Sequence, residues 1–126
     1  EGIVEMSFSF LSCSENDEIG ILMQSPDYES GNGLYFGINC GGIMTIYRNT
    51  EKVIQADASA VLKHGMENKN TLSVQMNDGK IQFNLNGVKG IEIAYEAGAD
   101  GYSGFYTAPY GMNTLRVMIQ SIEMFY

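Results

Sequence analysis

Apolar and polar side chains alternate along several short stretches of the chain, and this alternation predicts β-strands. In residues 4–13, every second side chain from Met6 to Phe10 is apolar, and the serines and Glu5 on the other side are polar. A period of two places one set on a buried face and the other on a solvent-facing one. This stretch therefore predicts a half-buried strand.

The clearest local pattern lies in residues 71–87, where two alternating segments flank a short polar turn. Asn77, Asp78 and Gly79 form that turn, and Asn86-Gly87 ends the second segment. Asn, Asp and Gly accept the backbone angles of tight turns, so the pattern predicts a hairpin. Gly41-Gly42 predicts a second hairpin in the same way.

The same kind of pattern predicts the remaining strands and loops, but less clearly. Residues 51–70 are the least regular part and include one possible helical turn at 59–65, while glycine, proline and polar residues predict loops at 25–33 and 98–111. The other predicted strands are residues 18–24, 34–40, 43–49, 90–95 and 115–126. These patterns name eight strands, and some nine or ten are expected in all. Without a sustained helical period, they predict an all-β sandwich or barrel.

Composition and charge narrow the functional classes. A chain of 126 residues with 44% hydrophobic residues is expected to form one domain over 1–126, either mature or excised from a larger protein. Its net charge of −8 is spread singly and would repel phosphate backbones, which argues against nucleic acid. No apolar stretch approaches the length of a membrane span.

In their order along the chain, these motifs resemble the concanavalin A-like lectin/glucanase superfamily, in particular its laminin-G-like and 3-keto-disaccharide-hydrolase-like members. The segments that carry the resemblance are Gly20 to Met23, Tyr35 to Ile38, Gly42 to Arg48, Asn70 to Val74, Gly79 to Gly87 and Gly101 to Phe105. The resemblance spans nearly the whole chain and implies a two-sheet antiparallel β-sandwich, a jelly roll. It implies no single function, because one fold hosts many.

The residues needed for catalysis are not found. The resemblance implies that a glucanase of this kind would carry two acids spaced along one strand, and two carboxylates are what glycoside hydrolysis requires. Glu92 and Glu123 each stand alone on their strands, and the acids at 15, 17 and 18 fall in a turn. His64 is the only histidine and fits a solvated loop position. We therefore predict no catalytic residues and no enzyme.

Candidate binding residues fall into two groups. A tyrosine-rich predicted loop contains Tyr102, Tyr106 and Tyr110, and aromatic faces pack well on sugar rings. Polar side chains on predicted strand faces can hydrogen-bond sugar hydroxyls, although exposed polar residues also occur without a function. These are Arg48, Gln75, Gln82, Asn84 and Arg116.

Calcium is a possible cofactor, and the two cysteines are a possible disulfide. Glu15, Asp17 and Asp100 offer the oxygen ligands that calcium takes, although they also fit an ordinary acidic surface. Cys13 ends the first predicted strand and Cys40 the third, so both could reach one edge of the sandwich and form a bridge. Alternatively, Cys40 is a small core residue.

Two functions remain open from the sequence. The first is a non-catalytic carbohydrate-binding module of a larger extracellular or cell-envelope protein, with an oligo- or polysaccharide as partner. The second is a structural or protein-interaction module of the laminin-G-like type, whose partners are neighbouring protein domains. The absence of tryptophan favours the second, and the tyrosines favour the first. A glycoside hydrolase ranks third.

Overall fold

The structure, a computed structural model, describes residues 2–25, 32–94, 102–109 and 115–125. Within these ranges the regular elements are ten β-strands, without a helix. The strands are β1 (Gly2–Ser12), β2 (Glu18–Ser25), β3 (Leu34–Asn39), β4 (Ile43–Arg48), β5 (Glu51–Asp57), β6 (Asn70–Asn77), β7 (Lys80–Leu85), β8 (Val88–Ala94), β9 (Tyr102–Ala108) and β10 (Arg116–Phe125).

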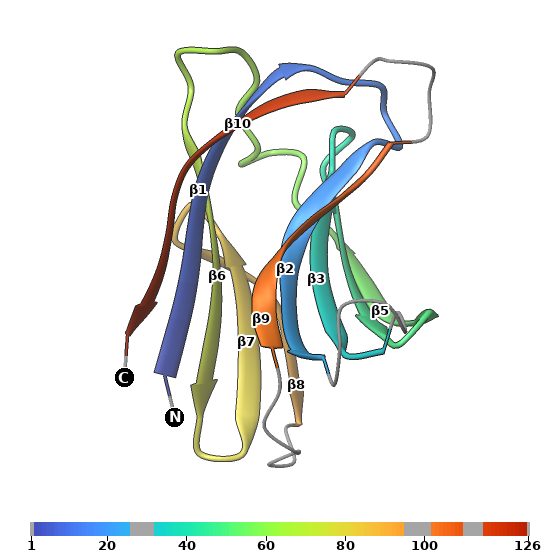
Figure 1. Ribbon diagram of the computed structural model, residues 1–126, viewed down its shortest axis with the longest axis vertical. Helices are drawn as coiled ribbons and strands as arrows, with labels where there is room; N and C mark the ends of the chain where they lie inside the picture. The colour runs from blue at the N-terminus through green and yellow to red at the C-terminus, as the bar shows by residue number, and fades with distance from the viewer. Residues whose placement is uncertain (1, 26–31, 95–101, 110–114, 126) are drawn as a thin grey trace.

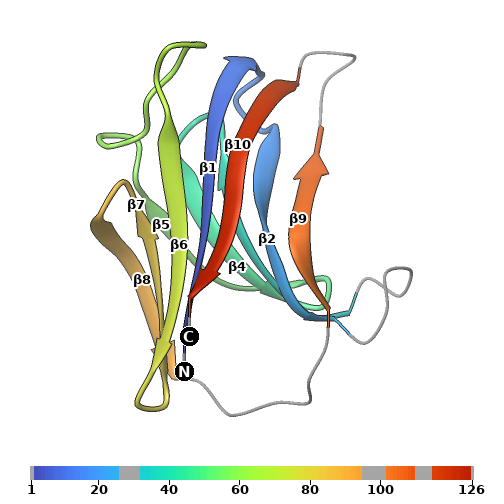
Figure 2. The same cartoon turned by 60° about the vertical axis from the view of Figure 1, so that its left-hand side comes forward.

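The strands form two sheets that pack face to face (Figures 1 and 2). The first sheet has the order β10-β1-β6-β7-β8 and the second the order β5-β4-β3-β2-β9. All the strand pairs in both sheets are antiparallel. The predicted all-β, two-sheet antiparallel sandwich is therefore confirmed.

The core is built from the inward side chains of both sheets. On β1, the alternating residues from Val4 to Phe10 are at most 2% exposed, as the sequence pattern predicts. Phe36 of the second sheet meets Phe83 of the first edge to face, with ring centroids 5.5 Å apart. Burial of a side chain of this size contributes about 1.5–3 kcal/mol, so such residues hold the two layers together.

Both predicted hairpins form. Asp78 and Gly79 have φ values of 51° and 74° and connect β6 to β7, and Gly42, between β3 and β4, has a φ of 95°. Asn86 and Gly87, with φ values of 53° and 80°, do more than end a strand, because they turn the chain directly into β8. Two successive residues with positive φ are the signature of tight hairpin turns.

Two strands were not predicted. Residues 51–57 form β5. A bulge breaks its alternation, because Val53 has no partner between the paired residues Ile46–Ile54 and Tyr47–Lys52. Residues 102–108, predicted as a loop, form the edge strand β9 paired with β2. Both are edge strands with largely exposed side chains, so the contrast between a buried and a solvated face is weak in their sequences. The predicted helical turn is reduced to a bond from Leu62 N–H to the Ala58 carbonyl.

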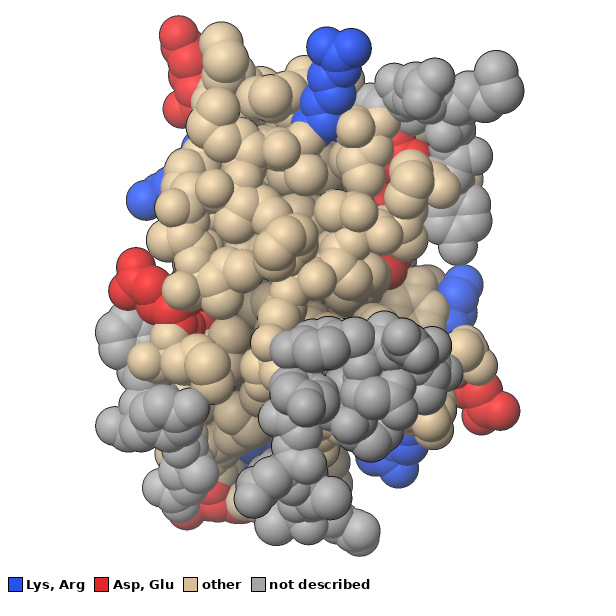
Figure 3. Space-filling view, viewed as in Figure 1, with Lys and Arg blue, Asp and Glu red and all other residues tan. Residues whose placement is uncertain are grey.

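The two ends of the described chain lie side by side. Ile3 of β1 stands opposite Phe125 of β10. Figures 1 and 2 show β1 and β10 next to each other. On the face shown in Figure 3, acidic and basic side chains are scattered singly rather than gathered into one patch. No helix among the described residues is long and apolar enough to cross a bilayer.

Candidate functional site

The outer face of the second sheet carries a set of aromatic and polar residues in register across its strands. One row runs Gly104, Leu22, Tyr35, Tyr47 and Lys52. The next row runs Tyr106, Gly20, Gly37, Thr45 and Gln55, and the third begins Ala108, Glu18 and Asn39. These residues alternate with the core residues of the same strands, so the packed interior fixes the direction of their side chains.

Two paired glycines make room for an aromatic ring on this face. A Cβ at Gly20 would lie 2.7 Å from Cε1 of Tyr106, and a Cβ at Gly37 would lie 2.6 Å from Cδ of Glu18 and against the Tyr106 hydroxyl. The Tyr106 ring can therefore lie down across neighbouring strands. The Tyr106 ring meets the Tyr35 ring edge to face, with 5.2 Å between the ring centroids. The two glycines, which have no side chain, thus leave the space that the Tyr106 ring occupies.

Glu18 is at the centre of this arrangement. It is 6% exposed, and each of its carboxylate oxygens accepts a bond from a tyrosine hydroxyl: Tyr47 at 3.0 Å and Tyr106 at 2.8 Å. A carboxylate offers about four acceptor positions, and the two tyrosine hydroxyls use two of them. The carboxylate is thereby held in one orientation on the face of the sheet.

The electrostatics follow from this burial. Burial raises the pKa of Glu18 above its ordinary value, and the bonds from Tyr106 and Tyr47 and the charge of Lys52 oppose that rise. Burial and the adjacent Glu18 charge raise the pKa of Tyr106 well above its ordinary value. Tyr106 therefore remains a hydrogen-bond donor at any ordinary pH.

Two hollows meet at Glu18 and Tyr47, and together we call them the groove. The larger, of about 490 Å³, is lined by Asn16, Glu18, Asn39, Ile43, Thr45, Tyr47, Lys52, Gln55, Ala56 and Asp57. The smaller, of about 310 Å³, is lined by Glu18, Tyr35, Tyr47, Asn49, Thr50, Tyr106 and Ala108. One half of the groove is mainly polar and the other mainly aromatic. This pairing suits a ligand with both hydroxyl groups and apolar C–H faces.

The polar half presents donors and acceptors in fixed positions. Gln55 donates to the Thr45 hydroxyl oxygen at 3.0 Å, and the Asn39 amide oxygen accepts from Ile43 N–H at 2.9 Å. The Asn39 NH₂ group is then the part that can donate to a ligand. Hydrogen bonds from Ser59 lower the pKa of Asp57, which keeps a second negative charge beside the groove.

The structure brings one of the predicted binding residues into the groove, namely Tyr106. Arg48 is exposed at the end of β4 and lines neither hollow. Of Tyr102 only the backbone is described, and Tyr110 lies outside the described residues. The tyrosines at 102 and 106 belong to a strand rather than to the predicted loop, which corrects that interpretation.

The other predicted binding residues lie on the opposite side of the molecule. Gln75 and Gln82 line a hollow of about 220 Å³ on the outer face of the first sheet, and Asn84 stands beside them. Gln82 donates to Asn84 at 3.0 Å, and Asn84 donates to Ser73 at 3.1 Å. Arg116 is exposed at the start of the edge strand β10. The structure does not bring these residues together with the groove.

The acidic turn supports the fold in a way that the sequence did not suggest. Asp17 is fully buried and accepts a bond from Ser14 N–H at 2.8 Å, whereas Glu15 is exposed. Asp100 lies outside the described residues. Among the residues that the structure describes, the one group of three or more potential metal-ligating side chains is Cys13, Cys40 and His64. Calcium binding stays a prediction.

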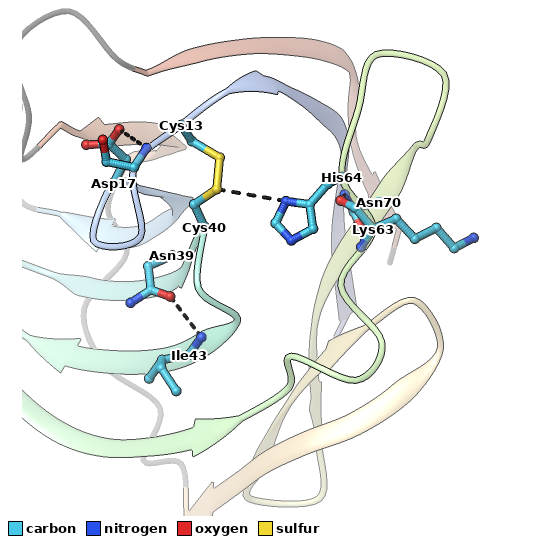
Figure 4. Close-up of a disulfide and its surroundings, with 9 residues drawn as sticks. Cys13, Asp17, Asn39, Cys40, Ile43, Lys63, His64 and Asn70 are labelled. Atoms are coloured by element: carbon cyan, nitrogen blue, oxygen red, sulfur yellow. Dashed lines mark hydrogen bonds between the residues drawn. A yellow bond between two sulfur atoms is a disulfide. The ribbon is translucent and has the colours of Figure 1, made fainter.

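Cys13 and Cys40 are joined as a disulfide, with 6.0 Å between their Cα atoms (Figure 4). This spacing lies in the ordinary range for such a bridge. Cys40 N–H also donates to the Asp17 carbonyl, and Gly41 N–H donates to the Glu15 carbonyl. The bridge and these bonds hold the turn that carries Asn16 against the end of β3, which carries Asn39, at one end of the groove.

Sequence reasoning missed most of the groove, including its central residue. Glu18 was counted with the acids of the preceding turn, although the strand predicted over 18–24 also included it. It is the first residue of β2 and shares a face with Gly20. The available signal was the alternation in residues 18–23, where Glu18 and Gly20 fall opposite the apolar side. A glycine inside a strand often marks the close approach of another group, and here Gly20 lies against Tyr106.

Comparison with known proteins finds likeness at the level of structure. No protein-family model matches the sequence, and no curated protein matches it either. The carbohydrate-binding module CBM66 from Bacillus subtilis superimposes with a TM-score of 0.73 at 11% identity, over 99% of this chain and 74% of that one. A tetrameric galectin from the ball sponge Cinachyrella gives 0.69 at 9% identity, over 99% and 92%.

A third solved structure is more distant but contains a ligand. The CBM40 of the Ruminococcus gnavus IT-sialidase, bound to α2,3 sialyllactose, gives a TM-score of 0.51 at 17% identity, over 76% of this chain and 54% of that one. At these identities the likeness concerns the fold. The chain therefore has the jelly-roll β-sandwich fold of the concanavalin A-like type.

Proposed function

We propose that this chain is a non-catalytic carbohydrate-binding module that binds an oligo- or polysaccharide in the groove. The observation that carries the proposal is Glu18, a buried carboxylate held by two tyrosine hydroxyls between an aromatic and a polar hollow. Its remaining acceptor positions suit sugar hydroxyls, and the tyrosine faces suit the C–H face of a sugar ring. The carbohydrate-binding modules among the similar folds support the same function.

The charges of the groove favour an uncharged glycan. Glu18 and Asp57 line the larger hollow, and Lys52 is the basic residue beside them. A carboxylated or sulfated sugar would bring further negative charge against these acids and against a net charge of −8. The proposed ligand is therefore a neutral saccharide.

A glycan array followed by calorimetry tests this function. We expect binding of one or more neutral glycans by the unaltered protein, and a loss of at least about tenfold in Glu18→Gln, because a charge-assisted bond contributes about 1.5–3 kcal/mol. Gln55→Ala should weaken binding less, since Gln55 is exposed at the edge of the groove. Gln82→Ala, on the opposite face, is the matched control and should bind normally. Absence of binding across a broad array would contradict the proposal.

A protein-interaction role is the second candidate, and exposed apolar residues favour it. Phe105 on β9 and Met118, Ile122 and Met124 on β10 are between 40% and 52% exposed. Both strands lie at the edges of their sheets, where another chain can pair. Pull-down with neighbouring domains of the parent protein, comparing Phe105→Ser with the unaltered chain, distinguishes this role from glycan binding.

The proposed location is extracellular or in the cell envelope. The support is the Cys13–Cys40 disulfide, since such bonds persist in oxidising compartments. Alkylation of the protein taken from its native compartment, with and without reductant, tests the location. Two thiols that react without reductant would contradict it.

We expect no hydrolysis of chromogenic glycosides. The glucanases that the sequence resembles would carry a pair of acids along one strand, and the sequence pattern does not supply that pair.

A further inference from the structure

A histidine faces the disulfide, outside the groove. Cys13 follows β1 of the first sheet, Cys40 follows β3 of the second sheet, and His64 lies in the connection from β5 to β6. The Nδ1 atom of His64 is 3.9 Å from the sulfur of Cys40, and the two sulfurs and one ring nitrogen all lie within 4.8 Å of one another. Figure 4 shows the ring turned toward the bridge.

The backbone on both sides of His64 is anchored. Asn70 is fully buried, and it accepts from Lys63 N–H and donates to the Lys63 carbonyl, both at 2.8 Å. On the other side, Gly65 N–H donates to the Phe10 carbonyl at 3.2 Å. The imidazole ring also stacks on the Phe10 ring, with 6.4 Å between the ring centroids. The histidine is thus held beside the sulfurs by contacts that do not involve its ring nitrogens.

Two thiolates and one imidazole are a ligand set for zinc. Zn²⁺ binds cysteine sulfur at about 2.3 Å and histidine nitrogen at about 2.0 Å in a tetrahedral arrangement, which places the ligand atoms roughly 3.5–3.8 Å apart. The 3.9 Å between Cys40 sulfur and His64 Nδ1 is close to that spacing. Sulfurs joined in a disulfide are not thiolates and do not provide this set.

We propose that Cys13, Cys40 and His64 form a redox-gated metal site, closed as the disulfide and open to Zn²⁺ after reduction. A dithiol reductant transfers two electrons to the sulfur–sulfur bond and becomes a disulfide itself, while the two cysteines become thiols. Zn²⁺ then displaces one proton from each thiol and binds Nδ1 of the neutral imidazole. The metal does not change oxidation state, and its fourth position is left for water or an external ligand.

A metal titration of the intact chain tests the proposal. The protein is reduced with an immobilised dithiol under anaerobic conditions, separated from it, and titrated with Zn²⁺ by calorimetry and with Co²⁺ by absorption. We expect one metal per chain, release of up to two protons, and a thiolate-to-cobalt charge-transfer band. The oxidised protein should show neither the band nor the proton release.

Three variants identify the ligands. Cys13→Ser with Cys40→Ser should abolish binding, and His64→Ala should weaken it at least about tenfold, since even indirect partners of a metal site change affinity by 10–100-fold. Lys63→Ala is the control, because Lys63 supports His64 through its backbone and its side chain plays no part. Equal affinity in His64→Ala and the unaltered protein would overturn the proposal. The proposal would also be overturned if the reduced, unaltered protein bound Zn²⁺ no more tightly than the double serine variant does.

Folding is followed in the same samples by circular dichroism. If reduction alone unfolds the chain, Zn²⁺ should restore the β-sheet spectrum of the unaltered protein and of Lys63→Ala, but not of His64→Ala. Failure of Zn²⁺ to restore that spectrum would also overturn the site.

Discussion

The two outer faces of the sandwich are both polar by composition, yet they are organised in different ways. On the first sheet, short side chains bond to one another: Ser7 to Thr71 at 3.2 Å, and Asn84 to Ser73 at 3.1 Å. On the second sheet, tyrosines and glycines surround a buried carboxylate, Glu18, and leave a groove. On both faces polar side chains bond to their neighbours, but on the second sheet these bonds surround a groove that also carries aromatic rings.

Under the proposed function, polarity alone does not mark the binding face. Gln75, Gln82 and Asn84 were predicted to bind because they are amides on a strand, but the bonds from Gln82 to Asn84 and on to Ser73 engage two of them with their neighbours. Glu18 has the opposite character, since a buried charge on a sheet face costs free energy unless it is paired. Under the proposed function, the buried charge of Glu18 is the better guide to the site.

The largest expected effect comes from cutting the covalent link at one end of the groove. Cys13→Ser with Cys40→Ser should lower the free energy of unfolding by about 3–4 kcal/mol, from loop-closure entropy over the separation of 27 residues. Denaturant unfolding measures this loss. Because the bridge ties the turn that carries Asn16 to the end of β3, which carries Asn39, glycan affinity should also fall. Unchanged stability would mean that the bridge adds no constraint.

The next effect comes from filling the recess under Tyr106. A methyl group at Gly37 would meet the Tyr106 hydroxyl and the Glu18 carboxyl, so Gly37→Ala should cost about 3 kcal/mol and abolish glycan binding. Gly104→Ala, on the same face, is the control, since a Cβ there meets no atom within 4 Å. Unfolding curves and calorimetry of both variants provide the comparison. Equal behaviour of the two would remove the glycines from our account of the groove.

Removing one hydroxyl tests the bond itself. Tyr106→Phe deprives Glu18 of the 2.8 Å bond and should lower the free energy of unfolding by about 2 kcal/mol, as for a hydrogen bond to a charged group. The same change should raise the pKa of Glu18 further, because that bond lowers it. A double-mutant cycle with Glu18→Gln measures the coupling. Additive effects would show that the two residues do not interact.

A smaller effect is the pH dependence that Glu18 confers. Because burial raises its pKa in the folded state, the folded chain holds this proton more tightly than the unfolded chain. The resulting stability is complete below the ordinary value of 4.5 and is lost as the pH rises through the raised pKa. Glu18→Gln should remove this component, so the stability difference between the two proteins should change across that range. A constant difference would contradict the pKa shift.

The smallest effect is expected on the opposite face. Gln82→Ala and Gln75→Ala should each change the free energy of unfolding by no more than about 0.5 kcal/mol, as surface substitutions usually do. Glycan affinity should be unchanged, because neither residue lines the groove. A clear loss of affinity in Gln82→Ala would move the binding site to the first sheet.

The sequence predicts the fold better than the site for a physical reason. Alternation identified the hairpin of β6 and β7 because one face of each strand is buried and the other is more exposed, and it identified β1 because apolar and polar residues alternate there, although Ser7 and Ser9 are buried as well. The groove depends on cross-strand neighbours instead. Tyr106 reaches Glu18 across 88 positions of sequence, through the pairing of β9 with β2. Local turn patterns predict hairpin partners, but no local pattern encodes the pairing of strands that are as far apart in the sequence as β2 and β9.

The pairing of β1 with β10 sets how the domain would respond to mechanical force. Ile3 stands opposite Phe125, and the two strands run antiparallel. Tension applied between these two positions would pull along the direction of the hydrogen bonds and open them one pair at a time, like a zipper, because antiparallel bonds run perpendicular to the strands. The domain should therefore yield at low force in a pulling experiment, and β10 should peel away first. The disulfide would not delay this step, because it joins β1 to the second sheet and leaves β10 untethered.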